Sequence, residues 1–191
     1  MPISLSKGQK VDLTKTNPGL TKVQIGLGWD VNKYDGGSSF DLDTAAFLLN
    51  SNGKVRDQGD FVFYGNLSHA SGAVTHKGDN LTGGGDGDDE QILIDLSKVP
   101  EVYDKIVFVA NIYECLSRKQ HFGMIKNAFI RIVDVDTHNE ICRYNLSENY
   151  DAMTAMIFGE VYWKDGKWKF NAIGQATKDP NIKSLSKKFQ S

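Results

Sequence analysis

Five acidic residues and five glycines share the stretch GDNLTGGGDGDDEQ, which runs from Gly78 to Gln91 without a lysine or an arginine. Two carboxylates about 4 Å apart repel each other by roughly 4 kcal/mol at an effective dielectric constant near 20. Such a stretch either spreads into water as a solvated loop or folds around a cation. Its glycines permit close backbone approach, and Asn80, Thr82 and the glycine carbonyls add neutral oxygens. Calcium prefers this mixture of oxygens, so the residue types favour a calcium site over a solvated loop.

A second acidic segment lies earlier in the chain. In SFDLDTAAF, Asp41 and Asp43 alternate with Phe40 and Leu42. On a strand, both carboxylates point to one side with Cα atoms about 7 Å apart, a suitable span for flanking one ion. Asp30 ends another apolar run and can join them. A polar outer strand face, which is the commoner origin of an Asp-x-Asp pair, remains the alternative.

The distribution of charge sets these two segments apart from the rest of the chain. Residues 79–90 carry −5 and residues 30–43 carry −3, while the whole chain has a formal charge of −2, so the remainder carries +6. The spacing is not that of an EF-hand, which needs a twelve-residue loop between helices. Magnesium suits the stretch less well than calcium, because it retains more waters and takes fewer protein ligands. The concentrated acid also argues against nucleic acid at this site.

The rest of the chain supplies the elements that must hold these residues. Runs rich in β-branched and aromatic residues alternate with turn signals, a pattern typical of strands. Asp165-Gly166 predicts a two-residue hairpin turn. Short helices are expected within 96–104 and 181–189. We expect strands at 22–29, 40–49, 61–64, 91–96, 105–113, 128–135, 140–146, 155–163 and 167–174.

This pattern predicts an all-β protein, a β-sandwich of about nine or ten mostly antiparallel strands with a few short helices; a barrel is the second choice. No internal repeat or linker divides the 191 residues, so a single domain over 1–191 is expected. Residues 175–191 form a basic tail in which Ile182, Leu185 and Phe189 share one helical stripe. This tail is expected either to pack on the sandwich or to dock on an acidic partner or an anionic membrane surface.

Other chemistry finds little support in the sequence. GLGWDV has two of the three glycines of a dinucleotide fingerprint and no following helix, and no GxxxxGK[ST] or GxSxG motif occurs. We therefore expect no enzyme activity. Cys115 and Cys142 form no CxxC pair and are expected to be free thiols, and His76 is expected at the surface. The first residues hold no apolar run, and no stretch approaches the roughly 18 apolar residues of a membrane span, so a cytoplasmic location is expected.

The acidic stretch GDNLTGGGDGDDE resembles the signature of the TerD family of bacterial tellurium-resistance and general stress proteins. The segments GLGWD, FDLDTAAFLL, DFVFYGNL, NAFIRIVD and KWKFNAIG are similar to that family in the same order, so the resemblance extends from Ile3 to Gly174. It implies a β-sandwich that binds calcium, commonly two ions, through its acidic loops. Glu114 matches a further acidic position, whereas Asp86 falls at a variable one. Matched by position, the expected ligands are Asp30, Asp41, Asp43, Asp79, Asn80, Asp88, Asp89 and Glu90.

The resemblance also implies a role. We expect a calcium-binding stress-response protein associated with tellurite resistance, acting as a non-enzymatic binding or scaffold module. Expected partners are other stress or tellurium-resistance proteins, with the inner membrane surface as a further place of association. Two alternatives are a metal-bridged binder of a small anion, such as a cyclic nucleotide, and a metal-dependent hydrolase. The chain departs from the family at Tyr113, where many members have His, and in the tail after Gly174.

Overall fold

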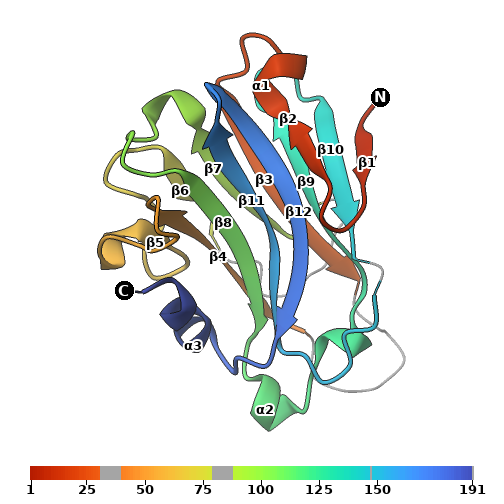
Figure 1. Ribbon diagram of the computed structural model, residues 1–191. Helices are drawn as coiled ribbons and strands as arrows, with labels where there is room; N and C mark the ends of the chain where they lie inside the picture. The colour runs from red at the N-terminus through yellow and green to blue at the C-terminus, as the bar shows by residue number, and fades with distance from the viewer. Residues whose placement is uncertain (31–39, 79–87, 147, 191) are drawn as a thin grey trace.

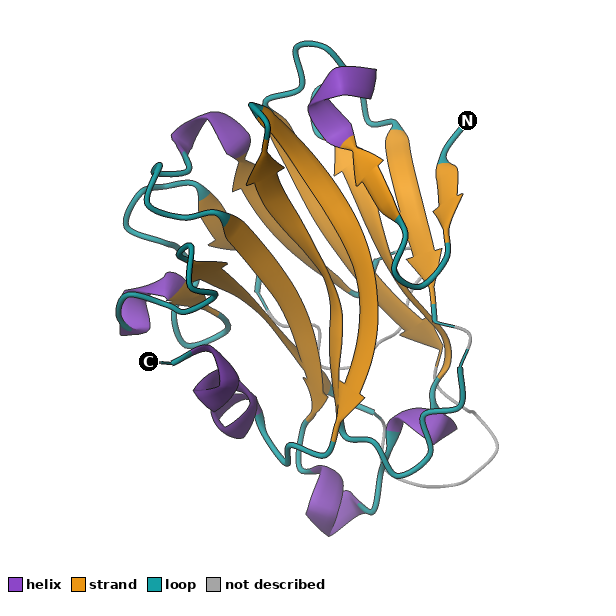
Figure 2. Ribbon diagram, viewed as in Figure 1, coloured by secondary structure: helices purple, strands orange, loops and turns teal. Residues whose placement is uncertain are grey.

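The fold consists of two six-stranded β-sheets that lie face to face (Figures 1 and 2). It comes from a computed structural model that describes residues 1–30, 40–78, 88–146 and 148–190. The first sheet has the spatial order β1 (Ile3–Leu5), β10 (Glu140–Asn145), β9 (Lys126–Asp134), β3 (Lys22–Asp30), β7 (Glu90–Asp95) and β6 (Val74–His76). The second has the order β2 (Lys10–Asp12), β12 (Lys167–Thr177), β11 (Ala155–Lys164), β8 (Lys105–Ile112), β4 (Leu42–Leu49) and β5 (Phe61–Val62).

Neighbouring strands are antiparallel except for β1 and β10, which run parallel. One face of each sheet carries the apolar residues of the alternating pattern, and these faces meet in the main core. From β7 come Ile92 and Ile94, and from β8 come Phe108 and Ile112, all buried. The predicted all-β sandwich is confirmed, with twelve strands in the described residues. The strands that the sequence did not predict are β1, β2 and β6, which have three residues each and cannot display a period of two clearly.

The outer face of the second sheet carries another apolar layer. Phe47 from β4 and Val109 from β8 point to this side and are buried. They are covered by the C-terminal segment, α3 (Ile182–Ser186) followed by the 3-10 turn η4 (Lys187–Phe189), which lies beside β4 (Figure 1). Because β8 is buried on both faces, its sequence is an almost continuous apolar run. The expected helix over 181–189 is confirmed, and its apolar stripe packs on the sheet.

The remaining helical elements are single turns at strand ends. They are α1 (Leu13–Thr16), η1 (Gln58–Asp60), η2 (Leu96–Lys98), α2 (Cys115–Arg118) and η3 (Phe122–Met124). The hairpin between β11 and β12 turns at Asp165 and Gly166, whose φ angles of 54° and 75° are those that a two-residue hairpin turn needs. In the described part of the chain, every helix is too short and too polar to cross a membrane.

Candidate metal-binding site

Two strands bring Asp30 and the pair Asp88 and Asp89 to the same end of the first sheet. Strands β3 and β7 pair antiparallel, with Leu27 opposite Glu90. The last residue of β3, Asp30, therefore lies at the sheet end where β7 begins, next to Asp88 and Asp89. The pairing follows from the apolar alternation of both strands, which fixes their register. Residues that the sequence separates by about sixty positions are thus brought into one neighbourhood.

Asp89 is held tightly against the end of β3. Its backbone N–H donates to the Leu27 carbonyl at 2.8 Å, and its carboxylate Oδ2 accepts from the Trp29 N–H at 2.7 Å. The side chain is buried, and this burial raises the pKa of the Asp89 carboxyl above its ordinary value. The negative charges of Asp30 and Asp88 raise that pKa further, against the hydrogen bond from Trp29, which lowers it. The Asp89 carboxylate thus lies close to other negative charges, and a bound cation would reduce the repulsion among them.

Asp30 is exposed and is oriented from a third strand. Its Oδ2 accepts a hydrogen bond of 2.6 Å from the Asn127 side-chain amide on β9. Asn127 has a φ of 54°, in the left-handed region that asparagine tolerates better than most residues. Asp30, Asp88 and Asp89 are predicted ligands that lie close together at this end of the first sheet.

Asp88 has a different set of contacts. Its side chain is fully buried, and its two carboxylate oxygens accept hydrogen bonds from Arg131 Nε at 2.7 Å and Arg131 Nη2 at 3.0 Å. The carboxylate lies over Gly26, where an added Cβ would stand 2.3 Å from the carboxyl carbon. This bidentate pair raises the pKa of Arg131. Asp88 is therefore bound to a cation of the protein itself, and its assignment as a metal ligand stays a prediction.

Glu90 points between the two sheets. Its carboxylate contacts the Thr44 hydroxyl on β4 and lies 3.4 Å from His76 Nε2 on β6. Thr44 Oγ1 is also 3.0 Å from His76 Nε2. Glu90, Thr44 and His76 are all buried, so this group joins the first sheet to the second. The expectation of a surface position for His76 is wrong, because β6 turns its ring into the sandwich.

Asp43 lies on β4 of the second sheet, and Asp41 comes just before that strand. The backbone carbonyl of Asp41 accepts from the Tyr113 N–H at 2.7 Å. Asp43 is on the outward side of β4, opposite Asn111 on β8. Asp43, Asn111 and Glu114 line one pocket of about 470 Å³ beside α2 and the start of α3. The structure thus brings Asp43 together with Glu114, and Asp30 with Asp89.

The predicted residues Asp79 and Asn80, together with Asp86, lie outside the described residues. Among the residues that are described, no three His, Cys, Asp or Glu side chains form a ready metal cluster. The metal-ligating atoms that do approach one another at the β3–β7 end are carboxylate oxygens, which suit a hard cation such as calcium and do not suit a thiolate-seeking metal. The donor set at the β3–β7 end therefore fits calcium in its chemistry.

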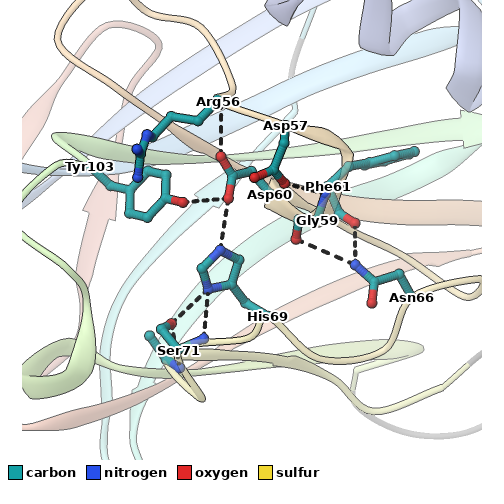
Figure 3. Close-up of polar contacts among 10 residues, drawn as sticks. Arg56, Asp57, Gly59, Asp60, Phe61, Asn66, His69, Ser71 and Tyr103 are labelled. Carbon is teal, nitrogen blue, oxygen red and sulfur yellow. Dashed lines mark hydrogen bonds and ion pairs between the residues drawn. The ribbon is translucent and has the colours of Figure 1, made fainter.

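A buried polar network that the sequence did not predict lies at the other end of the sandwich (Figure 3). Asp60 Oδ1 is 2.8 Å from His69 Nε2 and accepts from the Tyr103 hydroxyl at 2.5 Å. His69 Nδ1 is 2.7 Å from Ser71 Oγ and accepts from the Ser71 N–H at 3.1 Å. The Arg56 backbone N–H donates to Asp60 Oδ2 at 2.9 Å. Sequence reasoning missed this network because its members are scattered over three short segments.

The order serine–histidine–aspartate within this network is also that of a hydrolase triad. Here Asp60 is 1% exposed and His69 is 7% exposed, whereas Ser71 is half-buried. Ser71 Oγ additionally accepts from the Ala73 N–H at 3.1 Å, as expected of a residue that closes a local turn. The network therefore connects three loops.

The two-sheet sandwich defines a class of fold that known proteins share. A TerD domain family model matches residues 1–189. General stress protein 16U of Bacillus subtilis is 56% identical over 174 residues, which cover 91% of this chain and 90% of that protein. The tellurium resistance protein TerD of Serratia marcescens is 53% identical over 175 residues, covering 92% of this chain and 91% of that protein. The chain belongs to the TerD family.

Solved structures share the fold at low sequence identity. The crystal structure of a Streptomyces coelicolor homologue of the telluride resistance protein TerD superposes with a TM-score of 0.63 at 18% identity, covering 83% of this chain and 90% of that one. A crystal structure of a protein of unknown function gives a TM-score of 0.73 at 20% identity, with coverage of 91% and 99%. The resemblance to the family that the acidic stretch indicated is confirmed, and so is the sandwich fold.

Proposed function

We propose that this chain is a calcium-binding, non-enzymatic module of a tellurite-resistance and stress response. The calcium part rests chiefly on one observation, the meeting of Asp30 and Asp89 at the paired ends of β3 and β7. Both acidic segments of the sequence adjoin this point. Asp30 and Asp89 would hold the ion, with Asp79 and Asn80 as the further ligands that the family resemblance predicts. When bound, the ion would supply positive charge that offsets the negative charges of these carboxylates.

Calcium at this place would stabilise the fold through three strands. Asp89 is hydrogen-bonded to β3, and Asp30 is hydrogen-bonded to β9 through Asn127. A cation that binds only the folded state adds stability by mass action, about 2.7 kcal/mol at a free concentration 100 times the dissociation constant. Relief of the repulsion between the two carboxylates is the physical source of that gain.

Thermal unfolding in EDTA, in calcium and in magnesium tests the metal itself. We expect a clearly higher melting temperature in calcium than in EDTA, and a smaller rise in magnesium, which takes fewer protein ligands. Isothermal titration of the protein after EDTA treatment and dialysis should give the number of ions bound. Identical melting temperatures in the three solutions would count against a calcium site.

Two variants with a matched control locate the site. Asp89→Asn and Asp30→Asn each remove one negative charge from the β3–β7 end and should weaken calcium binding at least about tenfold. Asp136→Asn removes the same charge from the exposed turn between β9 and β10, at the other end of β9, and should leave calcium affinity unchanged. If all three variants bind calcium as the parent does, the ligands lie elsewhere.

The cellular part of the proposal rests on family membership. Its relatives are named general stress protein and tellurium resistance protein, and the enclosed Asp60–His69 pair supports a binding role over a catalytic one. We propose that the chain acts in the cytoplasm with other stress or tellurium-resistance proteins, some of them at the inner membrane surface. A pull-down with and without calcium tests this directly. Tellurite survival of cells carrying Asp89→Asn, compared with Asp136→Asn, then shows whether the ion is needed for protection.

A further inference from the structure

A cleft of about 570 Å³ opens at the end of the sandwich where β3 starts and β7 finishes. Its walls include Leu20 before β3, Leu96 after β7 and Tyr103 before β8. The tip of the β11–β12 hairpin adds Trp163 and Trp168. The length of β3, roughly 26 Å at 3.3 Å per residue, separates this cleft from Asp30 at the opposite end. The cleft is therefore distinct from the candidate calcium site.

The two tryptophans do not behave as ordinary core residues. They are directly opposed in the hairpin register, so they point to the same side, which for Trp168 is the core side. Trp168 is 8% exposed, as expected for that position, but Trp163 is 48% exposed. The centroids of the two rings lie 5.3 Å apart and the ring planes are inclined at 64°, which is an edge-to-face rather than a stacked arrangement. Trp163 therefore leaves part of its side chain open to solvent at the mouth of the cleft.

Tyr103 forms a third aromatic wall that the polar network holds in place. Its hydroxyl donates to Asp60, which His69 holds from the other side (Figure 3). The hydroxyl is thereby occupied, while the ring lines the cleft. Arg56, which also interacts with Tyr103, lines a different groove beside Phe61.

The charge of the lining indicates what the cleft would bind. Of the described residues that line it, Glu101 alone carries a charge, and Glu101 is exposed to solvent. Thr21 and Ser97 add hydroxyl groups. Aromatic faces together with one carboxylate are the combination that attracts organic cations through cation–π and charge interactions. The volume lies within the range of small-molecule sites.

We propose that this cleft binds a small organic ammonium ion with an apolar body, seated against Trp163, Trp168 and Tyr103 with its charge facing Glu101. The site is independent of calcium and of the proposed stress function. Affinity would be modest, in the millimolar range, because Glu101 and Trp163 are exposed to water. Choline is a suitable probe, and 3,3-dimethyl-1-butanol is its neutral counterpart of the same shape.

The three tryptophans of the chain provide an internal control. In nitrogen–proton correlation spectra at constant ionic strength, choline up to about 100 mM should shift the indole signals of Trp163 and Trp168 and saturate. The signal of Trp29, which lies near the other end of β3, should stay in place. The neutral alcohol should bind at least about fivefold more weakly, since it lacks the charge. Equal binding of alcohol and choline, or shifts that never saturate, would overturn the proposal.

Variants at the rim separate charge from shape. Glu101→Gln keeps the side-chain shape on an exposed residue and should weaken choline binding about fivefold. Trp163→Leu keeps an apolar wall without the aromatic face and should weaken it by a similar factor. Glu148→Gln, which removes an equally exposed acidic charge that pairs with Lys7, should change nothing. If Glu101→Gln binds choline as tightly as the parent chain does, no charge recognition occurs and the proposal fails.

Discussion

The Asp88 carboxylate and the Arg131 guanidinium form a bidentate ion pair, with Nε and Nη2 at 2.7 and 3.0 Å from its two oxygens. The Asp88 side chain is fully buried, and that of Arg131 is 25% exposed. Gln91 adds a longer contact to the same carboxylate, with its side-chain amide nitrogen at 3.4 Å. This pair fixes the residue immediately before Asp89, so it orients the start of β7 at the candidate calcium site.

Removal of Arg131 should therefore destabilise the fold. Arg131→Ala leaves the Asp88 carboxylate buried without its cation, and such a loss costs about 3 kcal/mol. Urea unfolding in EDTA measures the change in the free energy of unfolding. The double variant Asp88→Ala, Arg131→Ala removes both charges and should recover part of the loss. A double variant as unstable as the sum of the two single variants would mean that the pair contributes nothing specific.

The stability of the fold should depend on pH through the Asp60 carboxyl. Burial by itself would raise its pKa, but hydrogen bonds from Tyr103, His69 and the Arg56 backbone outweigh burial and lower it below 3.8. A carboxyl whose pKa is lower in the folded state than in the unfolded state stabilises the fold at pH values above its unfolded-state pKa. That stabilisation is lost as the pH falls through its folded-state pKa. The contribution of Asp60 should thus be complete at neutral pH and should fade below about pH 4.

Asp60→Asn tests this expectation. At neutral pH the variant should lose about 2 kcal/mol, because a buried charged acceptor of several hydrogen bonds is removed. The difference from the parent chain should shrink as unfolding is measured from about pH 6 down to about pH 3. Asp136→Asn, an exposed carboxyl, serves as the control. A difference that stays constant over this range would show that the charge of Asp60 is not the source of its stabilising effect.

The sequence predicted the long strands well because their patterns are local. The nine predicted strands all occur, since alternation over six or more residues, or a dense apolar run as in β8, identifies a strand without knowledge of its neighbours. The predicted strand 61–64 ends at Val62 because Phe63 and Asn66 bond to each other across a tight turn. The residues of that turn include no dipeptide that predicts the turn strongly.

The candidate site could be predicted only in part. The sequence marked Asp30 and Asp89 as ligands but grouped Asp30 with Asp41 and Asp43. Its approach to Asp89 follows from the antiparallel pairing of β3 with β7. The roles of Arg131 and Asn127 could not be predicted, because both come from β9, and only the sheet order places β9 beside β3. His76 was misplaced for a similar reason: three residues of β6 carry no period, and its contact with Thr44 joins residues of opposite sheets.

The cysteines are expected to be chemically inert in the folded protein. Both cysteines are free thiols, as the sequence predicted, and both are buried. Burial raises the pKa of the Cys142 thiol to about 12 and also raises that of Cys115. A raised thiol pKa keeps the reactive thiolate scarce at neutral pH. Ellman's reagent should therefore react very slowly with the native protein and rapidly in urea. Fast reaction of either thiol in the native protein would contradict this expectation.

Thiol inertness also bears on tellurite. A pair of inert thiols cannot supply electrons to tellurite, so protection should not depend on them. The double variant Cys115→Ser, Cys142→Ser should protect cells as the parent chain does, provided that its melting temperature shows it to be folded. Loss of protection in a stable double variant would point to a redox role for Cys115 or Cys142.

The C-terminal helix should act as part of the fold. Ile182 is 5% exposed and Leu185 is fully buried against the outer face of the second sheet, near Phe47 and Val109. The apolar stripe that a docking helix would present is thus already covered, which favours packing over docking for this tail. Leu185→Ala should cost about 3 kcal/mol, the usual range for a buried leucine. Lys187→Ala, at an exposed position in the same segment, should change the free energy of unfolding by less than about 0.5 kcal/mol.

Binding to anionic vesicles distinguishes the two roles of this tail. If its lysines dock on such a surface, Lys183→Ala combined with Lys187→Ala and Lys188→Ala should lower co-sedimentation while leaving stability intact, since each exposed lysine adds at most about 1 kcal/mol near the membrane. If the tail only packs, the triple variant should co-sediment to the same small extent as the parent, with or without calcium. The burial of Leu185 leads us to expect the second result. Strong, salt-sensitive binding that disappears in the triple variant would establish docking instead.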